Sequence, residues 1–284
     1  PLPAAVKGDG AYVIDSAGNR YLDASGGPAV SCLGHSHPKV IEAVRQQVGE
    51  IAFAYSAFFT HPAMEALADK LTALVETINK SGNDSALALP LDITQVETIA
   101  SAEKSLVEAW GGYDLVVFMA GDYTAMRAWE LDLKIAKQMV TINWEGFLNG
   151  LSIVIPRFMQ AKSGGIALVS SVAGYRGLPK SLVYGPTKAA LIHLAEVLYL
   201  DLRPLGLGVS IVNPGFVETP LTAGNDFRMP ALLEPEAAAA AVLQGWERGR
   251  FHIHFPRRFT NVLLGLRLLP YRAYFAAVRR FTGL

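Results

Sequence analysis

Tyr184 and Lys188 are the residues of this sequence whose types and spacing most directly suggest chemistry. They stand four positions apart in the segment YGPTK, at the start of a run whose apolar residues recur at helical spacing. On a helix, such side chains lie on the same face. A positive charge beside a phenol stabilises the phenolate and lowers the pKa of tyrosine, which is ordinarily about 10. The pair fits a general acid or base working near neutral pH; taken alone, it also fits a solvated helix face.

Two further polar residues stand where they could complete such a site. Ser171 lies thirteen positions before Tyr184, directly after the apolar run 166–170. In an open parallel sheet, ligands bind at the carboxyl ends of the strands. Asn143 is an amide inside a largely apolar predicted helix and could hold a water next to the lysine. The four residues together are a more specific signal than the pair.

The elements that must position these residues follow an α/β pattern. From Ala86 onward, short apolar runs alternate with helical patterns, which predicts βαβ units and a doubly wound parallel sheet. The predicted strands are residues 86–91, 114–119, 166–170, 208–212 and 251–255. The predicted crossover helices are residues 96–110, 130–160 and 183–202.

Residues 1–75 follow a different pattern. Two short runs flank a turn at Gly18 and Asn19, which predicts a β-hairpin. A helix beginning at Pro38 follows, and another is predicted over residues 62–78. This last helix crosses the change of pattern without a linker.

The composition limits the classes of function. With 284 residues, 51% of them hydrophobic, and a formal net charge of +0, the chain is globular and has no overall charge that would attract nucleic acid. Cys32 is the single cysteine, so no internal disulfide can form and a reducing compartment is expected. The sequence shows neither a membrane-spanning apolar run nor a secretory leader. We therefore expect a cytoplasmic protein without a nucleic-acid partner.

Six motifs in chain order resemble one family. They are LPLDIT, FMAG, TINWEG, SSVAG, YGPTK and NPGFVETP, and in them the chain is similar to the short-chain dehydrogenase/reductases from about Lys70 or Thr77 to Glu218. We assign residues 76–284 to this part. The resemblance implies an oxidoreductase that interconverts an alcohol and a carbonyl with NAD or NADP. Apolar residues between 221 and 237, where the family has its substrate lid, suggest a small apolar substrate.

The resemblance also implies a role for each matching residue. Tyr184 would be the general acid/base, and Lys188 would lower its pKa and hold the nicotinamide ribose. Ser171 would bind the substrate oxygen, and Asn143 would position a proton-relay water. The other cofactor-lining residues would be Asp92 at the adenine amine, Ala120 and Gly121 at the adenosine ribose, and Pro214, Gly215 and Thr219 at the nicotinamide. Met119 stands where the family usually has asparagine. A homo-oligomer formed through the helices of Asn143 and Tyr184 is also implied.

The family's phosphate-binding turn is missing. A dinucleotide needs its pyrophosphate held by backbone N–H groups at a helix N-terminus that follows a glycine-rich turn. Residues 1–75 instead resemble the N-terminal segment of class III pyridoxal-phosphate aminotransferases, most clearly in AYVIDSAGNRYLDASGGPAVSCLGHSHPKVIEAVRQQ. That family's lysine-bearing domain has no counterpart here, so pyridoxal phosphate is not expected. We interpret the chain as a chimera, with a Rossmann-like sheet that is incomplete or remodelled in its N-terminal half.

Two consequences of this chimera remain open. Residues 20–55 could form a strand, a loop with Gly26, Gly27 and Gly34, a helix and a second strand, and so rebuild a phosphate site. Otherwise, the alternative function is a catalytically inactive fusion that serves as an interaction or membrane-surface module.

The tail, residues 256–284, is basic and amphipathic. It carries six arginines and no acidic residue, a pattern typical of peripheral contact with an anionic membrane. Docking on the body of the protein or on a second subunit is the interpretation that we favour. Pro270 should divide the tail into two helices.

Two pairs of histidines are candidate metal ligands. His252 and His254 alternate along a predicted strand and point to one side, but no third ligand is evident. His35 and His37 better fit roles in a turn and a helix cap. No metal site is predicted.

Overall fold

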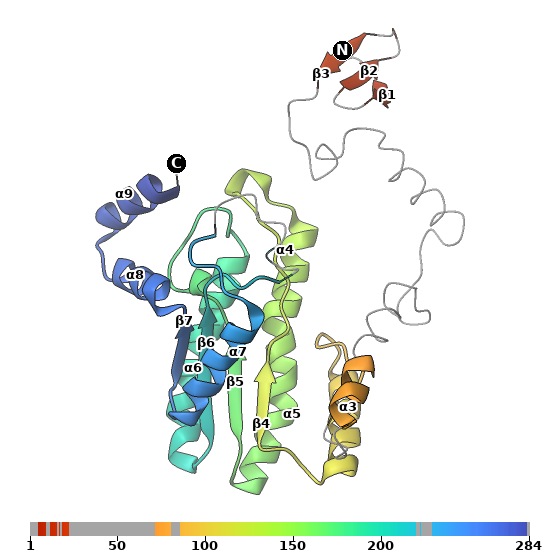
Figure 1. Cartoon of the computed structure of the whole chain (residues 1–284), viewed down its shortest axis with the longest axis vertical. Helices are drawn as coiled ribbons and strands as arrows, with labels where there is room; N and C mark the ends of the chain where they lie inside the picture. The colour runs from red at the N-terminus through yellow and green to blue at the C-terminus, as the bar shows by residue number, and fades with distance from the viewer. Residues whose placement is uncertain are drawn as a thin grey trace. The chain divides into compact units, whose positions relative to one another are not determined.

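The computed structural model describes residues 5–9, 12–15, 17, 19–22, 72–80, 86–219, 222 and 229–282 (Figure 1). The chain divides into two compact units, Pro1–Ala88 and Leu89–Leu284. The predicted boundary at 75/76, which was drawn from family resemblance, stays a prediction. Cys32, His35, His37, the helix expected from Pro38 and the glycine loop expected over residues 26–34 lie outside the described residues.

The smaller unit contains a three-stranded antiparallel sheet of order β1-β2-β3. Its strands are β1 Ala5–Asp9, β2 Tyr12–Asp15 and β3 Arg20–Leu22. Tyr12 pairs with Leu22 across the turn that carries Asn19, so the predicted hairpin is confirmed. Residues 72–79 are helical. All of them except residue 79 fall within the helix predicted over residues 62–78.

The larger unit is built on a parallel sheet of order β4-β5-β6-β7. The strands are β4 Leu115–Phe118, β5 Gly165–Val169, β6 Gly208–Pro214 and β7 His252–Phe255. Each overlaps one of the predicted strands. The prediction of an α/β fold with a Rossmann-like parallel sheet is confirmed. Among the described residues, this sheet has no strand that precedes β4 in the chain.

The prediction of a strand over residues 86–91 was wrong. These residues form no strand, and among the described residues the sheet ends at β4, which pairs with β5 alone. A strand is stable only where neighbours accept its backbone hydrogen bonds. The run is apolar, but it contains no β-branched or aromatic residue and has no described neighbour with which to pair, and it is irregular.

The described helices of the larger unit include the predicted segments and one helix that was not predicted, residues 235–247. They are α3 Val96–Trp110, α4 Leu133–Val140, the π-helical turn η2 Thr141–Glu145, α5 Gly146–Ala161, α6 Tyr184–Leu202, α7 Pro235–Glu247, α8 Arg257–Arg267 and α9 Tyr271–Thr282. Short 3-10 turns occur at η1 Ala128–Glu130, η3 Val172–Gly174 and η4 Arg203–Leu205. The long helix predicted over 130–160 starts at Leu133, because Asp132 caps it by accepting hydrogen bonds from the backbone N–H groups of residues 134 and 135.

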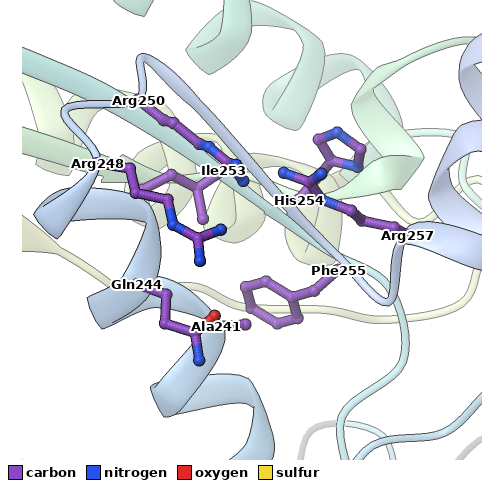
Figure 2. A pocket seen from close by; sticks show the side chains of 8 residues that line it. All are labelled: Ala241, Gln244, Arg248, Arg250, Ile253, His254, Phe255 and Arg257. Atoms are coloured by element: carbon purple, nitrogen blue, oxygen red, sulfur yellow. The ribbon is translucent and has the colours of Figure 1, made fainter.

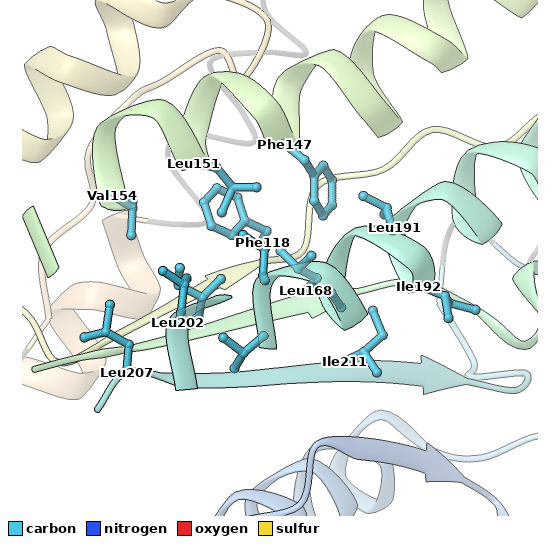
Figure 3. Close-up of a cluster of buried hydrophobic side chains, with 14 of the residues drawn as sticks. Phe118, Phe147, Leu151, Val154, Leu168, Leu191, Ile192, Leu202, Leu207 and Ile211 are labelled. Atoms are coloured by element: carbon cyan, nitrogen blue, oxygen red, sulfur yellow. The ribbon is translucent and has the colours of Figure 1, made fainter. Parts of the chain in front are cut away.

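Helices cover both faces of the parallel sheet. Phe147 and Phe158 of α5 and Leu191 of α6 are buried on one face with Ile211 of β6 (Figure 3). On the other face, Ala238 of α7 packs in a second cluster that contains Val212, Ile253 and Phe255. Neighbouring residues of β6 thus point into different clusters, as the alternation of a strand requires.

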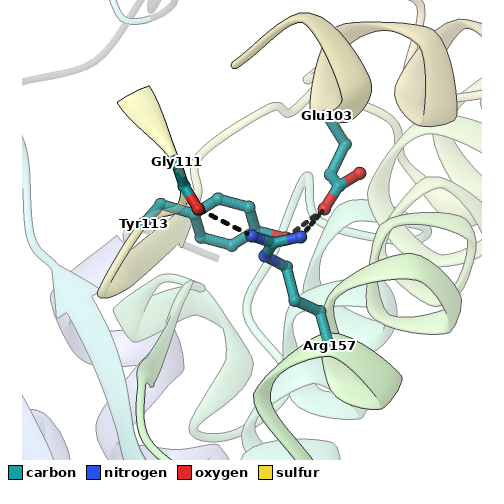
Figure 4. A network of polar contacts seen from close by, with 4 residues as sticks. All are labelled: Glu103, Gly111, Tyr113 and Arg157. Carbon is teal, nitrogen blue, oxygen red and sulfur yellow. Dashed lines mark hydrogen bonds and ion pairs between the residues drawn. The ribbon is translucent and has the colours of Figure 1, made fainter. Parts of the chain in front are cut away.

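Helix α3 is held to α5 by a small polar network (Figure 4). Arg157 Nη1 lies 3.1 Å from Glu103 Oε1, and Arg157 Nη2 donates to the Gly111 carbonyl at 3.4 Å. The Arg157 guanidinium also lies 5.1 Å from the centroid of the Tyr113 ring. The network fixes the helix that precedes β4 although residues 86–91 add no strand.

The tail is divided into two helices at Pro270, as predicted, and it packs against the rest of the larger unit. Arg176 Nη1 donates to the carbonyl oxygens of Leu266, Arg267 and Leu269 at 3.0, 3.2 and 2.7 Å. The same guanidinium lies 4.0 Å from the centroid of the Tyr274 ring, and Tyr274 Oη donates to the Gly177 carbonyl at 2.7 Å. The favoured interpretation, a tail docked on the protein body, therefore agrees with the structure.

Candidate active site

Ser171 and Tyr184 are brought together by the contact of two local elements. Ser171 follows β5 and caps the 3-10 turn η3, accepting from the Ala173 N–H at 3.1 Å. A Cβ on Gly174 would lie 2.7 Å from the Lys188 carbonyl carbon, so only glycine lets η3 pack this closely on α6. As a result, the Ser171 hydroxyl hydrogen-bonds the Tyr184 phenol.

Lys188 lies inside the site, with 3% of its surface exposed. Its Nζ donates to the Val169 carbonyl at 3.1 Å and lies 5.6 Å from the centroid of the Tyr184 ring. An ammonium has three donors. Within the described part of the chain, no other hydrogen-bond partner of Nζ is found, so two donors remain for a ligand. Burial lowers the pKa of Lys188 to about 8.

Asn143 occupies the π-helical turn between α4 and α5 and is fully buried. Its Oδ1 accepts from the Asp122 N–H at 2.7 Å, and its Nδ2 donates to the Asp122 carbonyl at 2.8 Å and to Thr187 Oγ1 at 3.2 Å. The amide thereby ties the loop after β4 to α6. Single-turn π segments often mark functional sites. The relay-water role stays a prediction.

Gly121 lies next to the side chains of Lys188 and Asn143. A Cβ at position 121 would come 3.3 Å from Lys188 Nζ and 3.6 Å from Asn143 Oδ1. A side chain here would fill the space in front of the ammonium. Ala120 and Gly121, predicted to line a cofactor, are therefore in the same loop that Asn143 holds.

The other residues predicted to line the cofactor lie further apart. Asp92 is exposed near the start of α3, where its Oδ1 accepts from the N–H and Oγ1 of Thr94 at 2.9 and 2.8 Å. Pro214 ends β6, and the Gly215 N–H donates to the Phe255 carbonyl at 2.7 Å. Thr219 follows in the next loop. No hydrogen bond within the described ranges links these four residues to Tyr184 or Lys188.

The pKa of Tyr184 is higher than the sequence led us to expect. Burial raises the pKa of Tyr184 to about 12, a hydrogen bond from Ser171 acts in the opposite direction, and Tyr123 adds to the rise. The expected lowering of this pKa by Lys188 is not found; desolvation disfavours the charged phenolate more than Ser171 stabilises it. At neutral pH the phenol therefore holds its proton.

Three contacts of the site were missed from the sequence. Tyr123 places its ring centroid 4.8 Å from that of Tyr184, edge to face. Thr187 accepts from Asn143 and donates to the Tyr184 carbonyl at 2.9 Å. Asp122 meets Asn143 through its backbone. The available signals were weak: two of these residues immediately follow Gly121 in the chain, and the third precedes Lys188.

The site can be tested for its fit to a nicotinamide dinucleotide. The two remaining donors of Lys188 and the side-chain-free surface of Gly121 fit a ribose with two hydroxyl groups. The phosphate end has no such counterpart in the part of the chain that is described, and Gly26, Gly27 and Gly34 lie outside it. The fit thus covers the nicotinamide half of the cofactor.

His252 and His254 point to the same side of β7, as predicted, with ring centroids 4.6 Å apart. His252 Nε2 lies 2.9 Å from the Tyr175 hydroxyl, and His254 Nδ1 lies 2.6 Å from Thr260 Oγ1. Across the described ranges, no group of three or more His, Cys, Asp and Glu side chains could hold a metal ion. Both rings are thus hydrogen-bonded parts of the packing.

None of the described helices combines the length and apolar character needed to cross a bilayer.

Comparisons with known proteins match both parts of the chain. The short chain dehydrogenase family model matches residues 54–228, and the class-III aminotransferase model matches residues 2–90. An uncharacterized oxidoreductase of Myxococcus xanthus is 33% identical over 219 residues, which cover 77% of this chain and 83% of that protein.

Two solved structures are similar as well. A short-chain dehydrogenase from Sphingobium yanoikuyae in complex with NADPH is 27% identical, with a TM-score of 0.60 over 69% of this chain and 79% of that chain. A short chain dehydrogenase from Burkholderia cenocepacia in complex with NADP, 22% identical, shares the fold with a TM-score of 0.61 over 69% of this chain and 82% of that chain.

Proposed function

Because the chain belongs to the short-chain dehydrogenase family, we propose that it interconverts a small alcohol and its carbonyl compound with a nicotinamide cofactor. The observation that carries the proposal is the setting of Lys188. Its buried ammonium has one protein acceptor in the described residues, at 3.1 Å, and faces Gly121. A buried ammonium with two unused donors is costly unless a ligand pairs with it.

Each catalytic residue has a role that its surroundings support. When bound, the nicotinamide supplies or accepts the hydride. Tyr184 holds the proton that moves to or from the substrate oxygen, and its raised pKa keeps that proton available for carbonyl reduction. Ser171 hydrogen-bonds the same oxygen. Lys188 holds the ribose hydroxyls, and Asn143 keeps the Gly121 loop in place.

The choice between NAD and NADP is left to experiment. The Sphingobium relative, 27% identical, was solved with NADPH, which makes NADPH the first cofactor to test. The adenosine end would lie near Asp92 and Ala120, which are both exposed. Gly121, which faces Lys188 Nζ, would instead adjoin the nicotinamide ribose.

A homo-oligomer is proposed through α5 and α6. Both helices expose large apolar side chains: Leu148, Met159, Val197 and Leu200 are 40, 42, 41 and 72% exposed. Apolar surface of this kind is often buried between subunits. Light scattering coupled to size-exclusion chromatography would show a mass above 30.6 kDa; a monomer at micromolar concentration would contradict the proposal.

A catalytically inactive fusion is the second candidate. Two observations favour it: residues 86–91 form no strand, and residues 2–90 match the class-III aminotransferase model. In that case, the four polar residues would be a remnant, and the basic tail would be the part that contacts a partner.

Cofactor titration separates the two candidates. NADPH and NADH are titrated into the full chain while nicotinamide fluorescence is followed, with Lys188→Ala as the test variant and Lys137→Ala, an exposed lysine of α4, as the matched control. The oxidoreductase predicts saturable binding that Lys188→Ala weakens at least about tenfold and Lys137→Ala leaves unchanged. No binding at millimolar cofactor, in protein that circular dichroism shows to be folded, would establish the inactive fusion.

A further inference from the structure

A basic pocket lies beside β7, away from the candidate active site (Figure 2). Its volume is about 320 Å³, within the range of small-molecule sites. The residues that line it come from α7, β7 and the segments that flank β7: Ala241, Gln244, Arg248, Arg250, Ile253, His254, Phe255 and Arg257. Ile253 and Phe255 belong to the cluster on the α7 face of the sheet, whereas α6 with Tyr184 and Lys188 covers the opposite face.

Three arginines converge on this pocket, and nothing in the described chain neutralises them. Arg248, Arg250 and Arg257 have no ion pair or side-chain hydrogen bond there, and no acidic residue lines the pocket. Figure 2 shows the three side chains extended along β7. Arg248 and Arg257 are exposed and Arg250 is partly buried. Arginine keeps its charge at neutral pH, so an anion between the three guanidinium groups would relieve the repulsion that water leaves unscreened.

The backbone holds these arginines in place. Gly249 adopts φ +60°, and its N–H donates to the Trp246 carbonyl at 2.8 Å, while the Arg250 N–H donates to the Gly245 carbonyl at 3.0 Å. This tight turn presents Arg248 and Arg250 to the same pocket.

The third arginine comes from the other end of β7. Arg257 begins α8, whose first turn contains no acidic residue. The positive end of a helix dipole normally disfavours a cation. An anion in the pocket would relieve this repulsion as well as that among the guanidinium groups.

We propose that this pocket binds a small molecule that carries phosphate groups. A guanidinium pairs with phosphate through two parallel N–H bonds, and three such groups match a ligand with about two or more negative charges at neutral pH. The Gln244 amide and the apolar side chains of Ala241, Ile253 and Phe255 can contact the remainder of the ligand.

Calorimetric titration of the full chain with inorganic pyrophosphate tests the proposal. The test variant is Arg248→Gln, Arg250→Gln and Arg257→Gln combined. The matched control, Arg279→Gln with Arg280→Gln, removes exposed charge from α9. We expect binding that weakens with added salt, is reduced at least about a hundredfold in the triple variant, and stays within about twofold in the control.

Further arms identify the site and the ligand. Lys188→Ala is expected to bind pyrophosphate normally, because that lysine belongs to the proposed cofactor site; loss in Lys188→Ala with retention in the triple variant would overturn the pocket proposal. No binding by the unmodified chain, or equal loss in the Arg279→Gln/Arg280→Gln control, would also overturn it. ADP binding more tightly than pyrophosphate would support a nucleotide ligand, and equal binding would support recognition of the phosphate groups alone.

Discussion

At one edge of the parallel sheet, β7 has Ile253 and Phe255 only 4 and 5% exposed, and both of its histidines are hydrogen-bonded. At the other edge, Leu115 begins β4 with 43% of its surface exposed, and Met119, which follows the strand, is 68% exposed. Both are edge strands among the described residues. Among the described residues, β7 is packed by both α7 and the tail helix α8.

The proposed catalytic and cofactor-lining residues divide between these two environments. Asn143 and Lys188 are buried, and Ser171 and Tyr184 partly so, where α6 meets the well-packed strands β5 and β6. Ala120 and Gly121 are exposed in the loop that follows β4. The described residues therefore bury the proposed catalytic side chains more deeply than the proposed cofactor-lining residues of the β4 loop.

The largest expected effect concerns the well-packed side. Tyr184→Phe removes the transferable proton but keeps the ring packed against Tyr123. Carbonyl reduction should fall about a hundredfold or more, the range for loss of a general acid, while NADPH binding is unchanged. Steady-state kinetics on a panel of small apolar ketones would measure this; an unchanged kcat would show that another group donates the proton.

The two edges can be compared directly by truncation. Ile253→Ala should lower the free energy of unfolding by about 3 kcal/mol, and Leu115→Ala by about 1 kcal/mol or less, because only the first leaves a cavity. Urea denaturation of both variants gives the values. Equal losses would mean that the β4 edge is covered after all.

The docked tail sharpens the same comparison. Arg176→Ala removes three hydrogen bonds and the stacking on Tyr274, and should cost about 2 kcal/mol. Arg258→Ala, at an exposed position of α8, is the matched control and should have little effect. Limited proteolysis of the tail would increase only in the Arg176 variant if the tail depends on that arginine.

A pH dependence of stability is expected at the β7 edge. Burial, with smaller contributions from His254 and Arg267, lowers the pKa of His252 from 6.5 to about 4. The unfolded chain therefore binds a proton that the folded chain does not, so stability should fall as the pH decreases from 6.5 towards 4. Part of this slope should vanish in His252→Gln and persist in His193→Gln, which alters an exposed residue of α6; chemical denaturation at several pH values would measure it.

Local pattern predicted much of the fold. Helices α3 and α6 lie where the apolar spacing placed them, and Pro270 separates α8 from α9. The prediction of a strand over residues 86–91 was wrong because a strand needs a neighbouring strand, and the residues of the run alone do not show whether one is present. Six successive residues of mainly apolar character, ALALPL, are not enough without a pairing partner.

The residues of the proposed site were chosen from the sequence, whereas the contacts between them became known only from the structure. The bonds from Asn143 to Asp122 and Thr187 join positions 21 and 44 residues apart, and the contact of Arg176 with Leu269 spans 93 residues. Spacing along the chain carries no information on such distances. The raised pKa of Tyr184 likewise follows from burial by the assembled fold.

The exposed edge of β4 has a consequence for the behaviour of the protein at high concentration. Its four residues, Leu115–Phe118, pair on one side only among the described strands, so N–H and C=O groups on the other side can accept a strand from another molecule. Unpaired edges of this kind are where chains begin to aggregate. The shortness of β4, four residues, limits the number of bonds that an intruding strand can form and so limits aggregation at this edge.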